Sequence, residues 1–312
     1  MAKKTPNSRS TGKNRGRSSR RGDAAPERPA RQRGKSQDAA SRGGSRDDRP
    51  QQKRAHSQNA AQQVMASDSG AEILYGKHSV KAVLLKRPSD VERLAIAGRE
   101  EYHQDLIELA HQSNIDTIQL DWPDFIAAGR FSEADKHQGI MALVKQRPIY
   151  LESELHQLTD AKCVLVLDQV SNPQNLATII RSAAFFNADA LLFLKNRAAT
   201  PTPEVVRFAV GGAEMIDMYQ MTNLSRCVET LKDLGFNVLG LDERGERTLA
   251  QHDLSTKTAF VIGAEGEGLR NKTRQYCSDL VRIPGGTDGL ESLNAAVATT
   301  IALYEFARLD VE

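Results

Sequence analysis

The chain has 312 residues, of which 39% are hydrophobic and 26% are charged, and its formal net charge is +2. This length suits two ordinary domains, but the hydrophobic share is low for so long a chain, so we expect part of it to stay unfolded. No run of about eighteen apolar residues occurs, so no membrane span is expected.

The net charge hides a strong asymmetry between the two ends of the chain. Residues 1–70 contain 17 Lys and Arg against 6 Asp and Glu, and the remainder contains 25 against 34, so a segment of charge +11 precedes one of −9. The first segment also lacks Ile, Leu, Phe, Tyr and Trp and cannot bury enough apolar surface to fold. We predict a disordered basic arm over residues 1–70, which either contacts phosphate groups nonspecifically or only solubilises the protein.

The amino terminus lacks the apolar stretch of a secretory signal, although its basic, serine-rich composition also resembles an organelle transit peptide. The three cysteines, Cys163, Cys227 and Cys277, lie far apart, without a CxxC pair or clustered histidines. We therefore expect a cytoplasmic protein with neither disulfides nor a metal site.

From residue 71 the chain alternates short apolar strands with amphipathic helices. A helix is predicted after residue 75, followed by strands at 93–96, 117–120 and 140–144 and helices at 100–111 and 123–127. This pattern predicts a small α/β domain over residues 71–147, followed by a linker at 148–158. His137 precedes the last strand, where a histidine is either structural or a ligand contact.

Residues 159–312 are predicted to form a second α/β domain with a parallel sheet covered on both faces, because strands and helices alternate throughout. Ligands of such sheets bind at the carboxyl ends of the strands. Strands are expected at 163–167, 190–194, 236–241, 259–262 and 280–283, and helices at 174–186, 202–212, 224–234, 271–277 and 292–308.

Three predicted strand ends carry unusual sequences. DQVSNPQNLATIIRSAAFF begins at Asp168, FVIGAEGEGL ends a strand in a glycine-rich acidic turn, and VRIPGGTDGLESLNAAVATT joins a strand to the last helix. The turn lacks the spacing of a dinucleotide-binding loop, and its carboxylates Glu265 and Glu267 would repel a pyrophosphate. Ser292 either binds a ligand or merely caps the last helix, with the glycines only making a turn.

Together these three sequences resemble the motifs of the SpoU class of RNA ribose 2'-O-methyltransferases, and the resemblance covers about residues 72–312. Asn175 and Arg181 match the first motif. The second is matched by Gly263, Glu265 and Gly268, and the third by Ile283-Pro284 followed by Ser292-Leu293-Asn294.

The resemblance implies a SPOUT domain with a deep trefoil knot that binds S-adenosylmethionine, preceded by an L30e-like RNA-binding domain at residues 71–147. The cofactor-binding residues that it implies are Leu239, Gly240, Gly263, Ile283 and Leu293. It assigns Arg181 to the reacting centre, either as a clamp for the target phosphate or as a base. Catalytic or binding roles are also implied for Asn175, Glu265, Ser292 and Asn294.

The domain order resembles that of bacterial members that methylate a guanosine of 23S rRNA, with transfer RNA as an alternative substrate. A noncatalytic RNA-binding or ribosome-assembly factor is a further alternative, because Ala177, Gly285 and Ala296 depart from the residues usual in the family. The family forms homodimers, and the last helix offers Val297, Ile301, Tyr304 and Phe306 as an apolar surface for such a contact.

Overall fold

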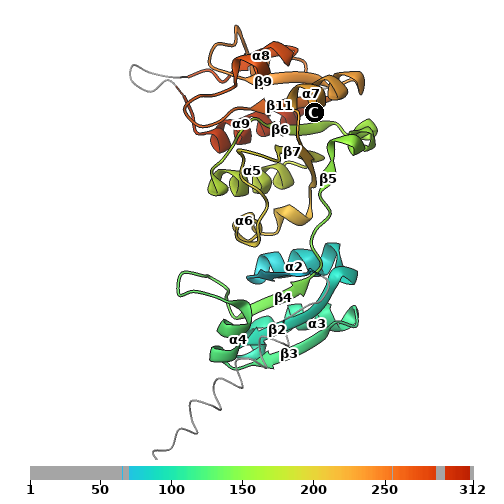
Figure 1. Cartoon of the computed structure of the whole chain (residues 1–312), viewed down its shortest axis with the longest axis vertical. Helices are drawn as coiled ribbons and strands as arrows, with labels where there is room; N and C mark the ends of the chain where they lie inside the picture. The colour runs from blue at the N-terminus through green and yellow to red at the C-terminus, as the bar shows by residue number, and fades with distance from the viewer. Residues whose placement is uncertain (1–64, 66–69, 255, 286–291, 310–312) are drawn as a thin grey trace, which may run out of the picture. The chain divides into compact units, whose positions relative to one another are not determined.

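The computed structural model describes residue 65 and residues 70–254, 256–285 and 292–309. Two β-sheets organise these residues, one formed within residues 72–144 and one within residues 150–282 (Figure 1). Within the described residues, no helix is long and apolar enough to cross a membrane. The predicted basic arm, except residues 65 and 70, and residues 286–291 of the predicted binding loop lie outside the described part of the chain.

The first sheet has four strands in the order β1-β4-β2-β3, in which β4 is antiparallel to both neighbours and β3 is parallel to β2. Helices α2 and α3 pack on one face and α4 packs on the other, which buries all five residues of β4. The elements are β1 (Glu72–Tyr75), α2 (Lys77–Lys86), β2 (Val91–Ala97), α3 (Gln104–Gln112), β3 (Asp116–Leu120), α4 (Trp122–Gly129) and β4 (Ile140–Val144).

The second sheet has eight strands, all parallel, in the order β10-β12-β9-β11-β6-β7-β8-β5. The predicted parallel sheet is thereby confirmed. Its strands are β5 (Tyr150–Leu151), β6 (Cys163–Leu167), β7 (Ala190–Leu194), β8 (Asp217–Met221), β9 (Asn237–Leu241), β10 (Arg247–Thr248), β11 (Thr258–Ile262) and β12 (Asp279–Arg282).

Helices cover both faces of this sheet. Along β6, Cys163, Leu165 and Leu167 face a core shared with α5, α6 and α9, whereas Val164 and Val166 face a core shared with α7. Neighbouring residues of a strand point to opposite faces, and both faces of the sheet are covered here, so all five side chains of β6 are buried. The helices are α5 (Pro173–Phe185), α6 (Pro203–Phe208), α7 (Leu224–Asp233), α8 (Asn271–Tyr276) and α9 (Ala295–Leu309), with α5 and α9 side by side (Figure 1).

The structure differs from the sequence-based prediction at several boundaries. Residues 150–151, inside the predicted linker, form edge strand β5, where the ring of Tyr150 packs 5.0 Å from that of Tyr219. The helix expected at 202–212 ends at Phe208, because Val210 and Gly211 take positive φ angles of 55° and 84°. The segment before residue 76, which the sequence left open as a strand start or a turn, forms β1, whereas β8 and β10 were missed.

The prediction that Phe306 belongs to the dimer surface is wrong. Its side chain is only 7% exposed and lies edge-on to Phe260 of β11, at 6.4 Å between ring centroids, so it belongs to the core. Ile301 packs partly against the same core, whereas Val297 and Tyr304 are 47% and 56% exposed. Helical periodicity placed these residues correctly on α9 but could not show how far around the helix the core extends.

Candidate active site

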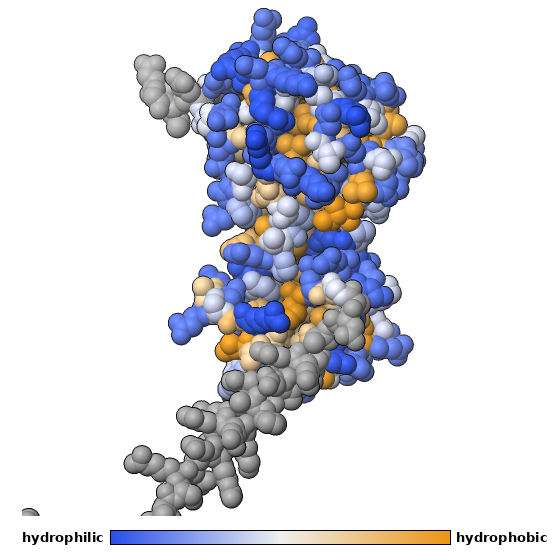
Figure 2. Space-filling view, in the orientation of Figure 1, coloured by the Kyte–Doolittle hydropathy of each residue, from blue (hydrophilic) through white to orange (hydrophobic). Residues whose placement is uncertain are grey.

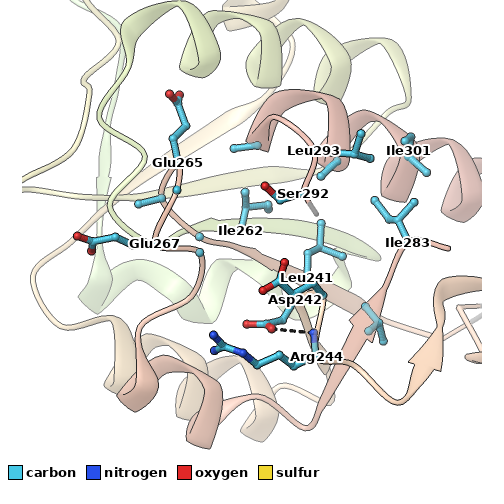
Figure 3. A pocket seen from close by; sticks show the side chains of 18 of the residues that line it. Leu241, Asp242, Arg244, Ile262, Glu265, Glu267, Ile283, Ser292, Leu293 and Ile301 are labelled. Carbon is cyan, nitrogen blue, oxygen red and sulfur yellow. Dashed lines mark hydrogen bonds between the residues drawn. The ribbon is translucent and has the colours of Figure 1, made fainter. Parts of the chain in front are cut away.

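A cavity of about 460 Å³ opens at the carboxyl ends of three adjacent strands, β12, β9 and β11. The segments that follow these strands form its walls together with the start of α9 (Figure 3). This is the edge at which the parallel sheet was expected to bind a ligand. The residues that line this cavity include Leu241, Asp242, Glu243, Ile262, Gly263, Glu265, Glu267, Arg274, Ile283, Ser292, Leu293 and Ile301.

The turn after β11, residues 263–269, folds back tightly on itself. The amide of Ala264 donates to the carbonyl of Gly268 at 3.2 Å, and the amide of Gly268 donates to the carbonyl of Ala264 at 2.9 Å. A Cβ on Gly263 would lie 2.1 Å from the carbonyl carbon of Gly268, so only glycine fits there. We call residues 263–269 the cofactor turn, because the family resemblance implies cofactor binding at Gly263.

Three of the predicted site residues meet at the rim of the cavity. The Nδ2 group of Asn175 on α5 donates to Oε1 of Glu265 in the cofactor turn. Its Oδ1 accepts from Nδ2 of Asn294 at 3.1 Å. Asn175 is 8% exposed, so its amide is held by partners from two other motifs rather than by water. The three motifs, far apart in sequence, therefore converge on one polar cluster.

Asn294 also caps α9. Its Oδ1 accepts from the backbone amides of Ala296 at 2.9 Å and Val297 at 3.3 Å, which otherwise lack partners in the first turn of the helix. This arrangement leaves the Nδ2 group free to reach Asn175. The cap considered for Ser292 is therefore made by Asn294, and Ser292 instead lines the cavity (Figure 3).

The cavity combines apolar and acidic surfaces. Leu241, Ile262, Ile283, Leu293 and Ile301 supply the apolar part, and Asp242, Glu243, Glu265 and Glu267 supply carboxylates (Figure 3). A flat apolar ring system that carries a cationic centre fits such a lining, and S-adenosylmethionine has both features. The volume lies within the range of about 300–1,000 Å³ typical of small-molecule sites.

The wall after β9 differs from the prediction. Leu239 is fully buried in the sheet, and a Cβ on Gly240 would meet the side chains of Leu269 and Leu280 at 2.8 Å, so neither residue lines the cavity. The wall begins one residue later, at Leu241. Asp242 follows, and its Oδ2 accepts from Nε of Arg274 at 2.6 Å. A polar run directly after an apolar strand was the available signal for this wall.

Arg181 lies on α5 six residues after Asn175, which places it about 9 Å further along the helix and on a different side. Its side chain is exposed, and no lining residue of the cavity comes from this part of α5. Among the described residues, none forms a hydrogen bond or ion pair with its guanidinium group. The structure therefore does not bring Arg181 into the cluster of Asn175, Glu265 and Asn294.

The three departures from the family pattern fit this structure. Ala177 and Ala296 are 1% and 2% exposed within the core, so their methyl groups fill apolar space. Gly285 has a φ of 148°, in the region that side chains disfavour. None of the three removes a member of the polar cluster.

Two of the three cysteines do not supply reactive thiolates. Burial raises the pKa of Cys227 and of Cys277 to about 12, so both thiols stay protonated at neutral pH. In the described part of the chain, no three His, Cys, Asp or Glu side chains are grouped as metal ligands would be.

Comparison with solved structures identifies the class of fold. The SpoU methyltransferase AviRb from Streptomyces viridochromogenes, solved with AdoMet, superposes with a TM-score of 0.65 at 22% identity, covering 82% of this chain and 98% of that one. An AdoMet-bound rRNA methyltransferase from Sinorhizobium meliloti gives a TM-score of 0.62 at 20% identity, covering 83% and 95%. The fold is thus that of the SpoU methyltransferases.

Sequence comparison narrows the relationship. Residues 162–304 match the SpoU rRNA Methylase family. The 23S rRNA (guanosine-2'-O-)-methyltransferase RlmB of Pseudomonas syringae pv. tomato is 36% identical over 246 residues, which cover 77% of this chain and 96% of that protein. RlmB of Escherichia coli (strain K12) is 33% identical over 242 residues, covering 76% and 98%. This chain belongs to the SpoU rRNA Methylase family.

Proposed function

We propose that this protein transfers a methyl group from S-adenosylmethionine to the ribose 2'-hydroxyl of a guanosine in 23S rRNA. The observation that carries the proposal is the cluster of Asn175, Glu265 and Asn294 at the rim of an apolar and acidic cavity. The names of the RlmB relatives, which are similar over most of their length, support the choice of RNA and nucleotide.

When bound, S-adenosylmethionine supplies an electrophilic methyl group on a sulfonium centre. The protein must hold the ribose oxygen in line with that methyl group and assist loss of the hydroxyl proton. Leu241, Ile283 and Leu293 would pack on the adenosyl group, while the backbone of the cofactor turn at Gly263 reads its polar edge. Four carboxylates against the two arginines Arg244 and Arg274 leave the lining with a net negative charge, which favours a cation there.

The polar cluster would orient the nucleotide. Asn175 already uses both halves of its amide, so its rotamer is locked before the substrate arrives. Glu265 and Asn294 are exposed, so the Glu265 carboxylate can accept a further bond from a ribose or base and the Asn294 amide can donate one. Ser292, two residues before Asn294, adds a hydroxyl to the lining of the cavity. Such preorganised polar groups stabilise charge that develops in the transition state.

Arg181 would clamp the target phosphate and stabilise the developing alkoxide. A guanidinium group rarely loses its proton in a protein, which makes a clamp a better role than a base. Because Arg181 lies away from the cavity of its own chain, we propose that it serves the cavity of a partner chain. Helices α5 and α9 also expose apolar residues, namely Phe185 on α5 and Val297 and Tyr304 on α9, which are 77%, 47% and 56% exposed. These residues suit a homodimer contact through the two helices.

The proposed organisation follows the family. Residues 1–70 form a basic arm that contacts RNA, residues 71–147 an L30e-like domain that recognises the RNA substrate, residues 148–158 a linker, and residues 159–312 a knotted SPOUT domain. A cavity walled by segments after three adjacent parallel strands supports the last assignment. Since ribosomal RNA is the substrate of the relatives, we propose a cytoplasmic location.

Incubation with radiolabelled S-adenosylmethionine and separate pools of 23S rRNA and transfer RNA tests the proposal. We expect label in 23S rRNA, in a dinucleotide that resists alkali because its 2'-oxygen is methylated. Label only in transfer RNA would favour the alternative substrate. Label in neither pool, with protein shown by calorimetry to bind the cofactor, would favour a noncatalytic RNA-binding factor.

Subunit mixing tests the placement of Arg181. Arg181→Ala should keep cofactor binding and lose most turnover, and Gly263→Ala should lose both. Mixed in equal amounts, the two inactive chains should recover about a quarter of wild-type activity, because half of the dimers are mixed and each has one intact site. Absence of recovery, with subunit exchange confirmed by native mass spectrometry, would place the whole site in one chain.

A further inference from the structure

The cofactor turn lies between two buried aspartates. It follows β11, and the strands on either side of β11 in the sheet are β9 and β6. Asp242 comes directly after β9 and Asp168 directly after β6, with side chains 4% and 0% exposed. Asp242 lines the cavity and can contact a ligand itself, whereas Asp168 does not line it. The carboxylate of Asp168 therefore has no direct part in the site described above.

Asp168 instead contacts both ends of the cofactor turn. Its backbone amide donates to the carbonyl of Ile262, the residue before the turn, at 2.7 Å. Its Oδ2 accepts from the backbone amide of Arg270, the residue after the turn, at 3.3 Å. Its Oδ1 lies 2.6 Å from Nη2 of the same arginine. One residue thus joins the point where the chain enters the turn to the point where it leaves.

A third partner residue, Thr273, ties Asp168 to α8. Oγ1 of Thr273, a residue 2% exposed, donates to Oδ2 of Asp168 at 2.6 Å. A carboxylate buried so completely is costly unless it is paired and hydrogen-bonded, and here both partner residues of the carboxylate, Arg270 and Thr273, belong to the segment that follows the cofactor turn. The charge of Asp168 is therefore balanced only when the turn is closed.

We propose that Asp168 is a positioning residue that closes the cofactor turn and thereby sets the affinity for S-adenosylmethionine. The same closure holds Glu265 at the tip of the turn within reach of Asn175. The inference rests on the proposed cofactor site. Asp168 acts through the backbone of the turn, so its loss should affect the cofactor far more than the RNA.

Asp168→Asn is the main variant, because asparagine keeps the size and removes the charge. We expect the dissociation constant for S-adenosylmethionine to rise about tenfold or more, as for loss of hydrogen bonds to a charged group. The KM for the cofactor should rise in parallel, and the dissociation constant for RNA should stay within about twofold. Thr273→Val removes a single donor and should act in the same direction with a smaller effect.

Asp189→Asn is the matched control. Oδ2 of Asp189 accepts from the backbone amides of Lys162 at 2.7 Å and Cys163 at 2.9 Å, at the amino end of β6, so its loss perturbs the same sheet away from the cavity. This variant should lower the melting temperature without weakening cofactor binding. Equal loss of affinity for S-adenosylmethionine in the Asp168 and Asp189 variants would mean that Asp168 contributes only to the general stability of the sheet, and would overturn the proposal.

Hydrogen exchange gives a readout that does not depend on the cofactor. The amides of Ala264 and Gly268, bonded across the turn, should exchange faster in Asp168→Asn than in wild type or Asp189→Asn. Unchanged exchange and unchanged affinity in both Asp168→Asn and Thr273→Val would refute the positioning role. If Asp168→Asn does not fold, Thr273→Val alone decides. Wild-type protein that fails to bind S-adenosylmethionine would contradict the proposed cofactor, while faster exchange would still support closure by Asp168.

Discussion

Gly263→Ala tests whether the cofactor turn is the element that binds the cofactor. The new Cβ would lie 2.1 Å from the carbonyl carbon of Gly268 and 2.3 Å from the amide nitrogen of Leu269, where real contacts are 3.0 Å or more. Both neighbours are backbone atoms, so the two arms of the turn must separate by about 1 Å. Overpacking of this kind costs about 1–3 kcal/mol of stability, and a displacement of about 1 Å at a site can reduce turnover about 100-fold.

The assay is calorimetric titration with S-adenosylmethionine, together with methyl transfer and thermal unfolding. Gly235→Ala, away from the turn, is the control, since Gly235 has a φ of 86° and nothing lies within 4 Å of the added Cβ. It should cost about 1–2 kcal/mol for the left-handed backbone alone and leave cofactor binding nearly intact. Wild-type affinity in Gly263→Ala, or equal loss in Gly235→Ala, would refute the reasoning.

Three further predictions follow from charge, packing and protonation. Deletion of residues 1–64, which keeps the buried Met65, should leave the melting temperature unchanged. It should also flatten the salt dependence of RNA binding, because 17 Lys and Arg against 5 Asp and Glu, a net charge of +12, are lost; titrations at several salt concentrations measure the slope. Phe306→Ala should destabilise the protein by about 3–5 kcal/mol in urea unfolding, whereas Tyr304→Ser should cost little stability but shift the sedimentation coefficient toward the monomer. Burial lowers the pKa of His103 and of His137 in the folded protein. The unfolded chain therefore binds more protons than the folded protein as the pH falls through about 6.5, and the melting temperature should drop there. The double variant His103→Gln/His137→Gln should abolish this drop.

Carboxylates with a lowered pKa act only at more acidic pH. Burial raises the pKa of Glu72 and of Asp217, so these two groups add stability as the pH falls and do not cause the drop. Two hydrogen bonds from Ser132 lower the pKa of Asp135, and the stability that this carboxylate adds is lost well below pH 5. His137 stacks 5.0 Å from the ring of Phe131, and its Nδ1 accepts from the amide of Gly139 at 3.1 Å. These contacts favour the structural reading of His137 over a contact with RNA. A drop in melting temperature that persists in the double variant would contradict this assignment.

Sequence patterns predicted the elements whose residues carry their own signal. The five apolar runs at 163–167, 190–194, 236–241, 259–262 and 280–283 are strands of one parallel sheet, because continuous apolar runs indicate burial on both faces. Asn187 has a φ of 54°, in the left-handed region that asparagine tolerates. The tight turn after β11 was also predictable, since glycines at 263 and 268 permit a close backbone approach and a positive φ that other residues disfavour.

Edge strands and helix limits were less accessible. β5 and β10 have two residues each and exist because a neighbouring strand offers hydrogen-bond partners, which no local pattern encodes. The burial of Phe306 depends on the position of Phe260 on another element. The family resemblance implied Leu239 and Gly240 as cofactor-binding residues, whereas the lining of the cavity begins one residue later, at Leu241.

The amino-acid sequence by itself determined the fold class, the basic arm's composition and the polar residues at the strand ends, because these follow from local composition and periodicity. Only the tertiary structure decided which of those residues meet. Asn175, Glu265 and Asn294 form one cluster because the segments after β6, β11 and β12 come together at the carboxyl edge of one sheet. Arg181 stays outside it because six residues of helix turn it to another side. The role of Asp168 likewise emerged only from the order β9-β11-β6, since strand order brings together residues that are distant in the chain.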